Sequence, residues 1–251
     1  MPQFLRLSIA ALLVVTSIGG LLKAGPITVD GNWTDWGIRP YLNDWTPTVG
    51  TRVFFENYVG TDGVGFLGPG WGGQYFDVEA IYLNRQGNQL DFGIVTGFDP
   101  DGVVHRGTRY FAGDIFVDTG SGWTTGIDLQ TGQVYTNVAS TNPTLFPSSG
   151  PYVITGGTVA GTADLSIPFN GIKKFYTGVR SRTGIHYFYE GSLDLGLLGG
   201  VGNTVGVHWT MSCGNDVGQG HLSVPEPGTA SLLAVGLLLG ALRLRRRHIR
   251  A

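Results

Sequence analysis

Glycine divides the middle of this chain into short segments. It accounts for 42 of the 251 residues, well above the ~7% of an average protein. Between residues 25 and 223 the apolar residues show no helical periodicity. They form short runs that alternate with polar residues or are rich in β-branched and aromatic side chains, which is the pattern of strands. Glycine also suits sharp turns that need a positive φ. The pattern therefore predicts an all-β domain.

About ten runs of this kind are candidate strands. They read TRVFFENYV (51–59), YFDVEAIYLN (75–84), QLDFGIVTGF (89–98), DIFVDT (114–119), TTGIDL, GQVYTNV, TADLSIPF, KFYTGVR, IHYFYEGSLDL and VGVHWTMS. Two connections predict hairpins: NRQGNQ, with Gly87 and Asn88 in the loop, and DLQTGQV, through Thr131 and Gly132. So many strands in about 200 residues predict a single β-sandwich or jelly roll over residues 25–223.

The N-terminus has the layout of a secretory signal peptide. Arg6 precedes an uncharged run from Leu7 to Leu22, and the small residue Ala24 offers a cleavage point. We therefore expect a signal helix over residues 1–24 and a mature protein that begins near Gly25, outside the cytoplasm. The alternative is an uncleaved membrane anchor.

The C-terminal segment, residues 224–251, ends in a second apolar run. Residues 228–242 carry no charge, but they would span only ~22 Å as a helix, less than the ~30 Å hydrocarbon core. Length alone therefore fits a core helix equally well. Pro225 and Pro227 favour an extended entry, and the basic residues that follow favour a transmembrane helix with a cytoplasmic end. This basic stop comprises Arg243, Arg245, Arg246 and Arg247.

The order of VPEP, an apolar run and a terminal arginine cluster resembles the PEP-CTERM sorting signal of Gram-negative bacteria. The resemblance implies that the export machinery and a membrane enzyme, the exosortase, handle the chain. It implies Pro225, Glu226 and Pro227 as the processing motif. After a stage anchored in the inner membrane, the protein would reach the cell surface or the exopolysaccharide matrix. The same tail is also called an ice-binding protein C-terminal domain, but no residue of this chain indicates ice binding.

A second resemblance concerns the middle of the chain. ITVDGNWTDW (27–36) resembles the opening strand of DOMON-like and related carbohydrate-binding sandwiches. The later segments DVEAIYL, LDFGIVTGF, GDIFVDT and HWTMSCGNDV resemble a group of PEP-CTERM surface proteins that carry such a domain. The resemblance implies a DOMON-like sandwich and polysaccharide as a partner.

Carboxylates are clustered in three places. Asp77 and Glu79 lie two apart on one expected strand and would share a face. The remaining candidates lie in a turn or beside a strand, and all six are candidate ligands of a structural Ca²⁺: Asp77, Glu79, Asp99, Asp101, Asp114 and Asp118. Ordinary turn aspartates are the simpler explanation. Asp77 or Glu79 together with Asp114 would be the acid–base pair if the domain hydrolyses glycosides.

Six tryptophans offer flat apolar faces, on which sugar rings stack. We expect Trp33, Trp36 and Trp209 in the core, because aromatic side chains dominate sandwich cores. Trp71, in a glycine-rich loop, and Trp123 are the candidates for glycan stacking.

Composition and missing motifs exclude several functions. The net charge is -2, and five arginines lie in the tail, so the rest of the chain is acidic and nucleic acid is not an expected partner. The single cysteine, Cys213, allows no internal disulfide and no cysteine-rich zinc site, and we expect it to be buried. Neither HExxH nor GxSxG is present. We therefore expect a secreted, non-catalytic binding or structural domain; the alternatives are a polysaccharide-active enzyme and a matrix component without a ligand.

Overall fold

The computed structural model describes residues 27–39, 42, 44–55, 65–67, 70–72, 74–166, 173–176, 183–199, 202, 204–223 and 236. This part of the chain is mostly β-sheet, which confirms the all-β prediction. Its helical elements are the short 3-10 turns η3 (Gln74–Phe76), η4 (Pro147–Ser149) and η5 (Leu195–Leu198).

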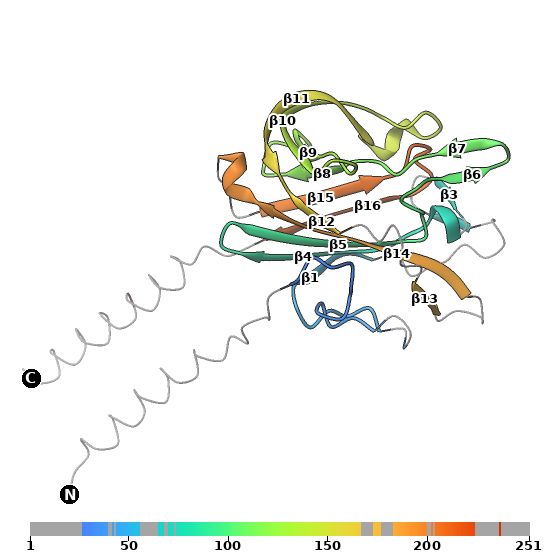
Figure 1. Cartoon of the computed structure of the whole chain (residues 1–251), viewed down its shortest axis with the longest axis horizontal. Coiled ribbons are helices and arrows are strands. Elements are labelled where there is room, and N and C mark those ends of the chain that lie inside the picture. The colour runs from blue at the N-terminus through green and yellow to red at the C-terminus, as the bar shows by residue number, and fades with distance from the viewer. Residues whose placement is uncertain are drawn as a thin grey trace, which may run out of the picture.

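Two large antiparallel sheets make up most of the fold (Figure 1). The first has the order β1-β4-β5-β14-β12, with β13 also paired to β14. Its strands are β1 (Thr51–Phe55), β4 (Val78–Gln86), β5 (Gln89–Thr96), β12 (Asp164–Ser166), β13 (Lys173–Tyr176) and β14 (Thr183–Asp194). The second has the order β11-β10-β9-β8-β15-β16. Its strands are β8 (Ile115–Asp118), β9 (Thr125–Ile127), β10 (Gln133–Thr141), β11 (Val153–Thr162), β15 (Thr204–Thr210) and β16 (Val217–Ser223).

Two small hairpins lie outside these sheets: β2 (Gly65–Leu67) with β3 (Gly70–Gly72), and β6 (Val103–His105) with β7 (Thr108–Tyr110).

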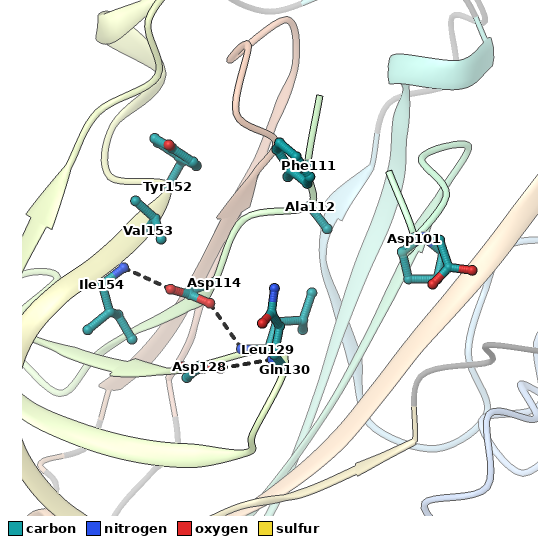
Figure 2. Close-up of a pocket in the computed structure, with 11 residues that line it drawn as sticks. Asp101, Phe111, Ala112, Asp114, Asp128, Leu129, Gln130, Tyr152, Val153 and Ile154 are labelled. Atoms are coloured by element: carbon teal, nitrogen blue, oxygen red, sulfur yellow. Dashed lines mark hydrogen bonds between the residues drawn. The ribbon is translucent and has the colours of Figure 1, made fainter. Parts of the chain in front are cut away.

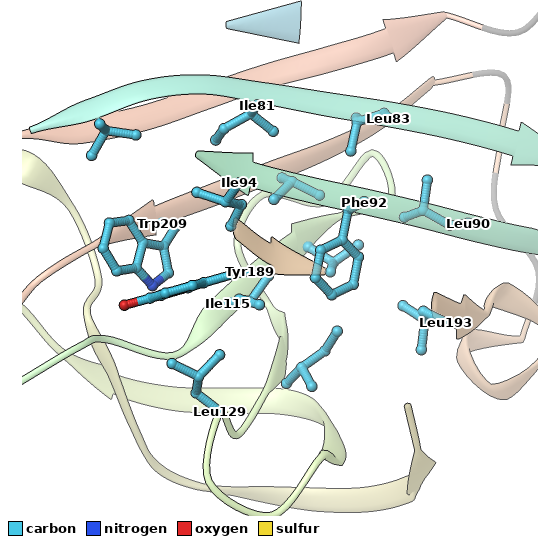
Figure 3. Close-up of a cluster of buried hydrophobic side chains, with 14 of the residues drawn as sticks. Ile81, Leu83, Leu90, Phe92, Ile94, Ile115, Leu129, Tyr189, Leu193 and Trp209 are labelled. Carbon is cyan, nitrogen blue, oxygen red and sulfur yellow. The ribbon is translucent and has the colours of Figure 1, made fainter. Parts of the chain in front are cut away.

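The main core lies between the two large sheets (Figure 3). Alternate residues of each strand point into it, as expected for sheets that bury one face. The first sheet contributes Phe92, Ile94 and Tyr189, and the second contributes Ile115 and Trp209. The Trp209 ring packs edge-on against Tyr189, with ring centroids 5.3 Å apart, and its Nε1–H donates to the Gly113 carbonyl oxygen at 2.9 Å. Trp209 is thus fully buried with its polar atom satisfied, as predicted.

Both predicted hairpins are present. Gln86 pairs with Gln89 across a two-residue loop, and Gly87 has a φ of 62°, the conformation that glycine favours at the first position of a tight hairpin turn. In the second hairpin β9 pairs with β10, and Gly132 has a φ of 72°. Glycine has another role at Gly93 and Gly191, where a Cβ would collide with the rings of Phe188 and Phe92.

A second apolar cluster covers the outer face of the first sheet. It joins Trp36, Ile38 and Trp45 of the N-terminal segment (residues 27–50) to residues of the strands beneath, which are Ala80, Tyr82, Val95 and Phe188. The Trp36 ring lies 6.0 Å from Tyr82 and 6.4 Å from Phe188. Trp36 is buried as predicted, whereas Trp33 is only partly buried at the margin of this cluster and lies outside the main core.

The expected opening strand over residues 27–36 is wrong, because this segment forms bends and turns. Its N–H groups bond to a side chain instead of a neighbouring strand. The Glu190 carboxylate on β14 accepts from the backbone N–H groups of Asp30 at 3.0 Å and Gly31 at 2.8 Å, and from Trp36 Nε1–H at 2.7 Å. One buried carboxylate therefore attaches the N-terminal segment to the sheet.

The predicted sorting segments cannot be placed on this fold. Residues 1–24, the motif Pro225–Pro227 and the run 228–242, apart from Gly236, lie outside the described residues. Among the residues that are described, no helix has the length and apolar character needed to cross a membrane.

We predict that Glu190→Gln changes how stability depends on pH. Burial raises the pKa of Glu190 to about 7, with a smaller contribution from Asp35, although the three N–H donors act in the opposite direction. A raised carboxyl pKa means that the native state holds a proton that the unfolded state has lost. The free energy of unfolding therefore falls as pH rises from about 4.5 to about 7, by up to ~1.4 kcal/mol per pH unit for one proton.

Denaturant titrations between pH 4 and 8 should show that Glu190→Gln lacks this component. Asp164→Asn, an exposed change on β12, should keep the pH dependence of the wild-type protein. An unchanged pH dependence in Glu190→Gln would contradict the assignment.

Candidate functional site

A cavity of about 550 Å³ opens beside the second sheet (Figure 2). Its walls come from four segments that are far apart in the sequence: the loop after β5, the segment that enters β8, the β9–β10 turn and the start of β11. The lining residues are Pro100, Asp101, Phe111, Ala112, Asp114, Asp128, Leu129, Gln130, Tyr152, Val153 and Ile154. Leu129 also belongs to the main core, so the cavity borders directly on the packed interior.

Asp114 connects two of these walls. Its Oδ1 accepts from the Leu129 N–H at 3.0 Å, and its Oδ2 accepts from the Ile154 N–H at 2.7 Å. Its own N–H donates to the Tyr152 carbonyl oxygen at 2.7 Å. Burial raises the pKa of Asp114 to about 6; the two N–H donors lower it, and the nearby Asp128 raises it further. Asp114 therefore has a structural role in shaping the cavity.

Asp128 forms the β9–β10 turn. Its Oδ1 accepts from the N–H groups of Gln130 and Thr131, each at 2.9 Å, a bonding pattern typical of aspartate in turns. The Gly132 N–H donates to the Asp128 carbonyl oxygen at 2.8 Å and closes the turn. This local bonding places Leu129 and Gln130 on the cavity wall.

Phe111 supplies an accessible aromatic face. Its side chain is 53% exposed, and its backbone is fixed by two bonds to Ser212, one from Phe111 N–H to Oγ and one from Ser212 N–H to the Phe111 carbonyl oxygen. The Arg109 guanidinium lies 5.6 Å from the centre of the Phe111 ring and donates to the Asp101 carbonyl oxygen at 2.6 Å. Arg109 thus contacts two residues that line the cavity, Asp101 and Phe111.

The six predicted calcium ligands do not converge. The described residues contain no group of three or more His, Cys, Asp or Glu side chains that could hold a metal ion. Asp101 and Asp114 line the cavity, while Asp99 accepts the Tyr187 hydroxyl at 2.6 Å and Asp118 accepts the N–H groups of Gly120 and Gly122. The calcium hypothesis gains no support from this part of the chain.

Asp77 and Glu79 are both buried. Asp77 precedes β4, and the register of β4 shifts between Val78 and Ala80, so simple alternation does not apply. Glu79 and His186 form a buried hydrogen-bonded pair, with Oε1 and Nε2 2.7 Å apart and side chains 3% and 0% exposed. Neither Asp77 nor Glu79 lines the cavity, so the acid–base pair with Asp114 is not assembled there.

Of the two stacking candidates, only Trp123 has a described side chain. Trp71 belongs to β3 and pairs with Phe66, but its side chain is outside the described residues. Trp123 is partly buried, with its ring 5.2 Å from His208 and 5.5 Å from His221. His221 in turn contacts Asp118, with Nε2 and Oδ2 3.1 Å apart. Trp123 therefore packs on two histidines of neighbouring strands and does not line the cavity.

Sequence reasoning missed most of the cavity. Phe111, Tyr152, Asp128 and Gln130 were not predicted as site residues, although the DLQTGQV turn that carries two of them was. These residues could have been found by noting aromatic residues and carboxylates that lie in the loops next to predicted strands.

Cys213 is buried and unpaired as predicted, and burial raises its pKa to about 11.

No model of a protein family matches the chain, and no curated protein or solved structure matches it either. The functional argument therefore depends on the geometry of the described residues.

We predict that Glu79 stabilises the fold and does not serve the cavity. Glu79→Leu leaves His186 buried without its carboxylate partner and should lower the free energy of unfolding by about 1–3 kcal/mol, as measured by urea denaturation. The double variant Glu79→Leu/His186→Leu removes both polar side chains and should recover much of this loss. A single variant as stable as the wild-type protein would contradict the structural role.

Proposed function

We propose that the domain binds a glycan in the Asp114 cavity without altering it chemically. The observation that carries this proposal is the cavity itself, which combines the exposed Phe111 ring with the acceptor groups of Asp101, Asp128 and Gln130. Its volume of about 550 Å³ falls within the ~300–1,000 Å³ range of small-ligand sites. A sugar presents an apolar face to aromatic rings and hydroxyl donors to carboxylates, so this lining fits its chemistry.

A binding role is favoured over catalysis by the state of the cavity carboxylates. Both oxygens of Asp114 accept backbone N–H groups, and Asp128 is bonded within its own turn. Hydrolysis of a glycoside needs two carboxyl groups that face each other across the scissile bond. Asp114 instead maintains the cavity shape with both of its oxygens, and Asp128 uses one oxygen in its own turn.

We further propose that the protein is exported and sorted to the cell surface or the exopolysaccharide matrix. The support is the sequence order of a signal-like N-terminus, the motif Pro225–Pro227, an uncharged run and a basic end. The two antiparallel sheets agree with a DOMON-like or jelly-roll sandwich between these segments. In this location a glycan-binding cavity would attach the protein to extracellular polysaccharide.

Phe111→Ala should weaken glycan binding. The substitution removes the exposed ring, which we expect to stack on a sugar face, and should reduce affinity about 3- to 10-fold, as for loss of one aromatic contact. A glycan array would identify a retained oligosaccharide, and isothermal titration would measure its affinity. Tyr75→Ala removes another exposed aromatic ring, 60% accessible and absent from the cavity lining, and should leave the affinity unchanged. If no glycan is retained, the domain does not have the proposed function.

Replacing Pro225, Glu226 and Pro227 together by alanine should stop sorting. We expect the variant to accumulate in the membrane fraction of the native host, because its apolar run remains while the processing motif is lost. Cell fractionation with immunodetection measures this. Removal of residues 224–251 should instead release the domain into the medium. Normal surface delivery of the triple variant would disprove the assignment of the motif.

A further inference from the structure

We propose that the glycan bound by the Asp114 cavity carries protonated amines, as in a polymer of glucosamine. This inference rests on the proposed function, since it names the chemical class of the ligand for the same cavity.

The charge of the lining is the first argument. Three of its eleven residues are aspartates, and none is lysine, arginine or histidine. A concave site with charges of one sign concentrates the field and attracts ligands of the opposite charge. A uronic-acid polymer would be repelled, and a neutral sugar would gain hydrogen bonds and stacking but no charge attraction.

Two of the carboxylates are available to a ligand. Asp128 uses only Oδ1 for its two bonds with backbone N–H groups of the described chain. Asp101 is exposed and lies apart from the other two, beyond the Asp128–Gln130 turn in the view of Figure 2. An extended oligosaccharide could therefore meet a carboxylate on each side of the cavity, with one amine near each.

Arg109, which contacts two lining residues, makes no ion pair with these groups in the described part of the chain. Arg109 directs its guanidinium to the Asp101 carbonyl oxygen and to the Phe111 ring, and no contact joins it to a cavity carboxylate in the described part of the chain. His208 is buried and is not a lining residue. Its Nε2 donates to the Pro151 carbonyl oxygen at 2.9 Å, and burial lowers its pKa, which favours the neutral ring at neutral pH.

The aromatic side chains of the lining provide a further argument. Phe111 and Tyr152 both border the cavity, and an ammonium group over an aromatic face gains a cation–π attraction that a hydroxyl group does not. The Arg109 guanidinium already lies 5.6 Å from the centre of the Phe111 ring, so we assign this attraction to Tyr152. The same rings pack against the apolar face of a sugar. The cavity thus combines three features that an amine-bearing sugar uses: carboxylates, aromatic faces and a lining without lysine, arginine or histidine.

The test compares two matched probes on the purified protein at pH 6, where most of the amines are protonated: a glucosamine hexamer and its fully N-acetylated, neutral counterpart. Isothermal titration should give at least ~10-fold tighter binding of the amine, and this preference should shrink as salt rises from 50 to 500 mM, because screening weakens charge pairs. Asp128→Asn and Asp101→Asn should each weaken binding of the amine probe several-fold more than binding of the neutral probe, and so reduce the preference. Asp164→Asn, which removes an exposed carboxylate on β12, should leave the preference intact.

The outcomes separate this inference from the proposed function. Equal affinity for both probes, or tighter binding of the neutral one, overturns the amine assignment and leaves glycan binding standing. Binding of neither probe, with no other oligosaccharide retained on an array, overturns both. Circular dichroism and melting curves of Asp128→Asn and Asp101→Asn exclude misfolding as the cause of a lost preference.

Discussion

The β4, β5 and β14 strands carry apolar side chains on both faces, and this constraint governs the rest of the fold. Phe92 and Ile94 point into the main core, while Tyr82, Val95 and Phe188 point away from it. A sheet of this kind can leave neither face in water, because each buried aromatic or aliphatic side chain contributes ~1.5–3 kcal/mol. The second sheet covers one face, and the irregular N-terminal segment covers the other. Trp36 and Trp45 are the side chains that fill the outer layer.

Glu190 attaches the N-terminal segment to the first sheet. A segment without strand pairing still needs acceptors for its N–H groups, since an unsatisfied buried donor costs about 1–3 kcal/mol. The Glu190 carboxylate accepts from two of these backbone groups and from the Trp36 indole. The cost of burying the carboxylate is expressed in its raised pKa, and the hydrogen bonds offset part of it.

The sequence predicted what depends on local patterns. Alternation along VEAIYLNRQ and QLDFGIVT, with Gly87 between them, specifies a hairpin, because register follows from the turn and from which side chains must be buried. The sequence could not predict that residues 27–36 form turns over the outer face of the first sheet, because ITVDGNWTDW fits a strand as well as a turn. The partner that decides between them, Glu190, lies about 160 residues away. The cavity was missed for the same reason: Asp114 was a candidate, but its bonds to Leu129 and Ile154 depend on tertiary packing.

Hydrogen bonds from backbone N–H groups also distinguish the aspartates that stabilise the fold from those that can bind a ligand. A glycine-rich fold has many turns, and turns expose N–H groups that need acceptors. Asp99, Asp114 and Asp118 meet this need with their side-chain oxygens. A cation at such a residue would have to compete with N–H groups that already hold the oxygens in place. Asp101 and one oxygen of Asp128 are the acceptors that face the cavity without this competition from the described chain, so ligand recognition depends on these two residues and not on the larger set that sequence spacing suggested.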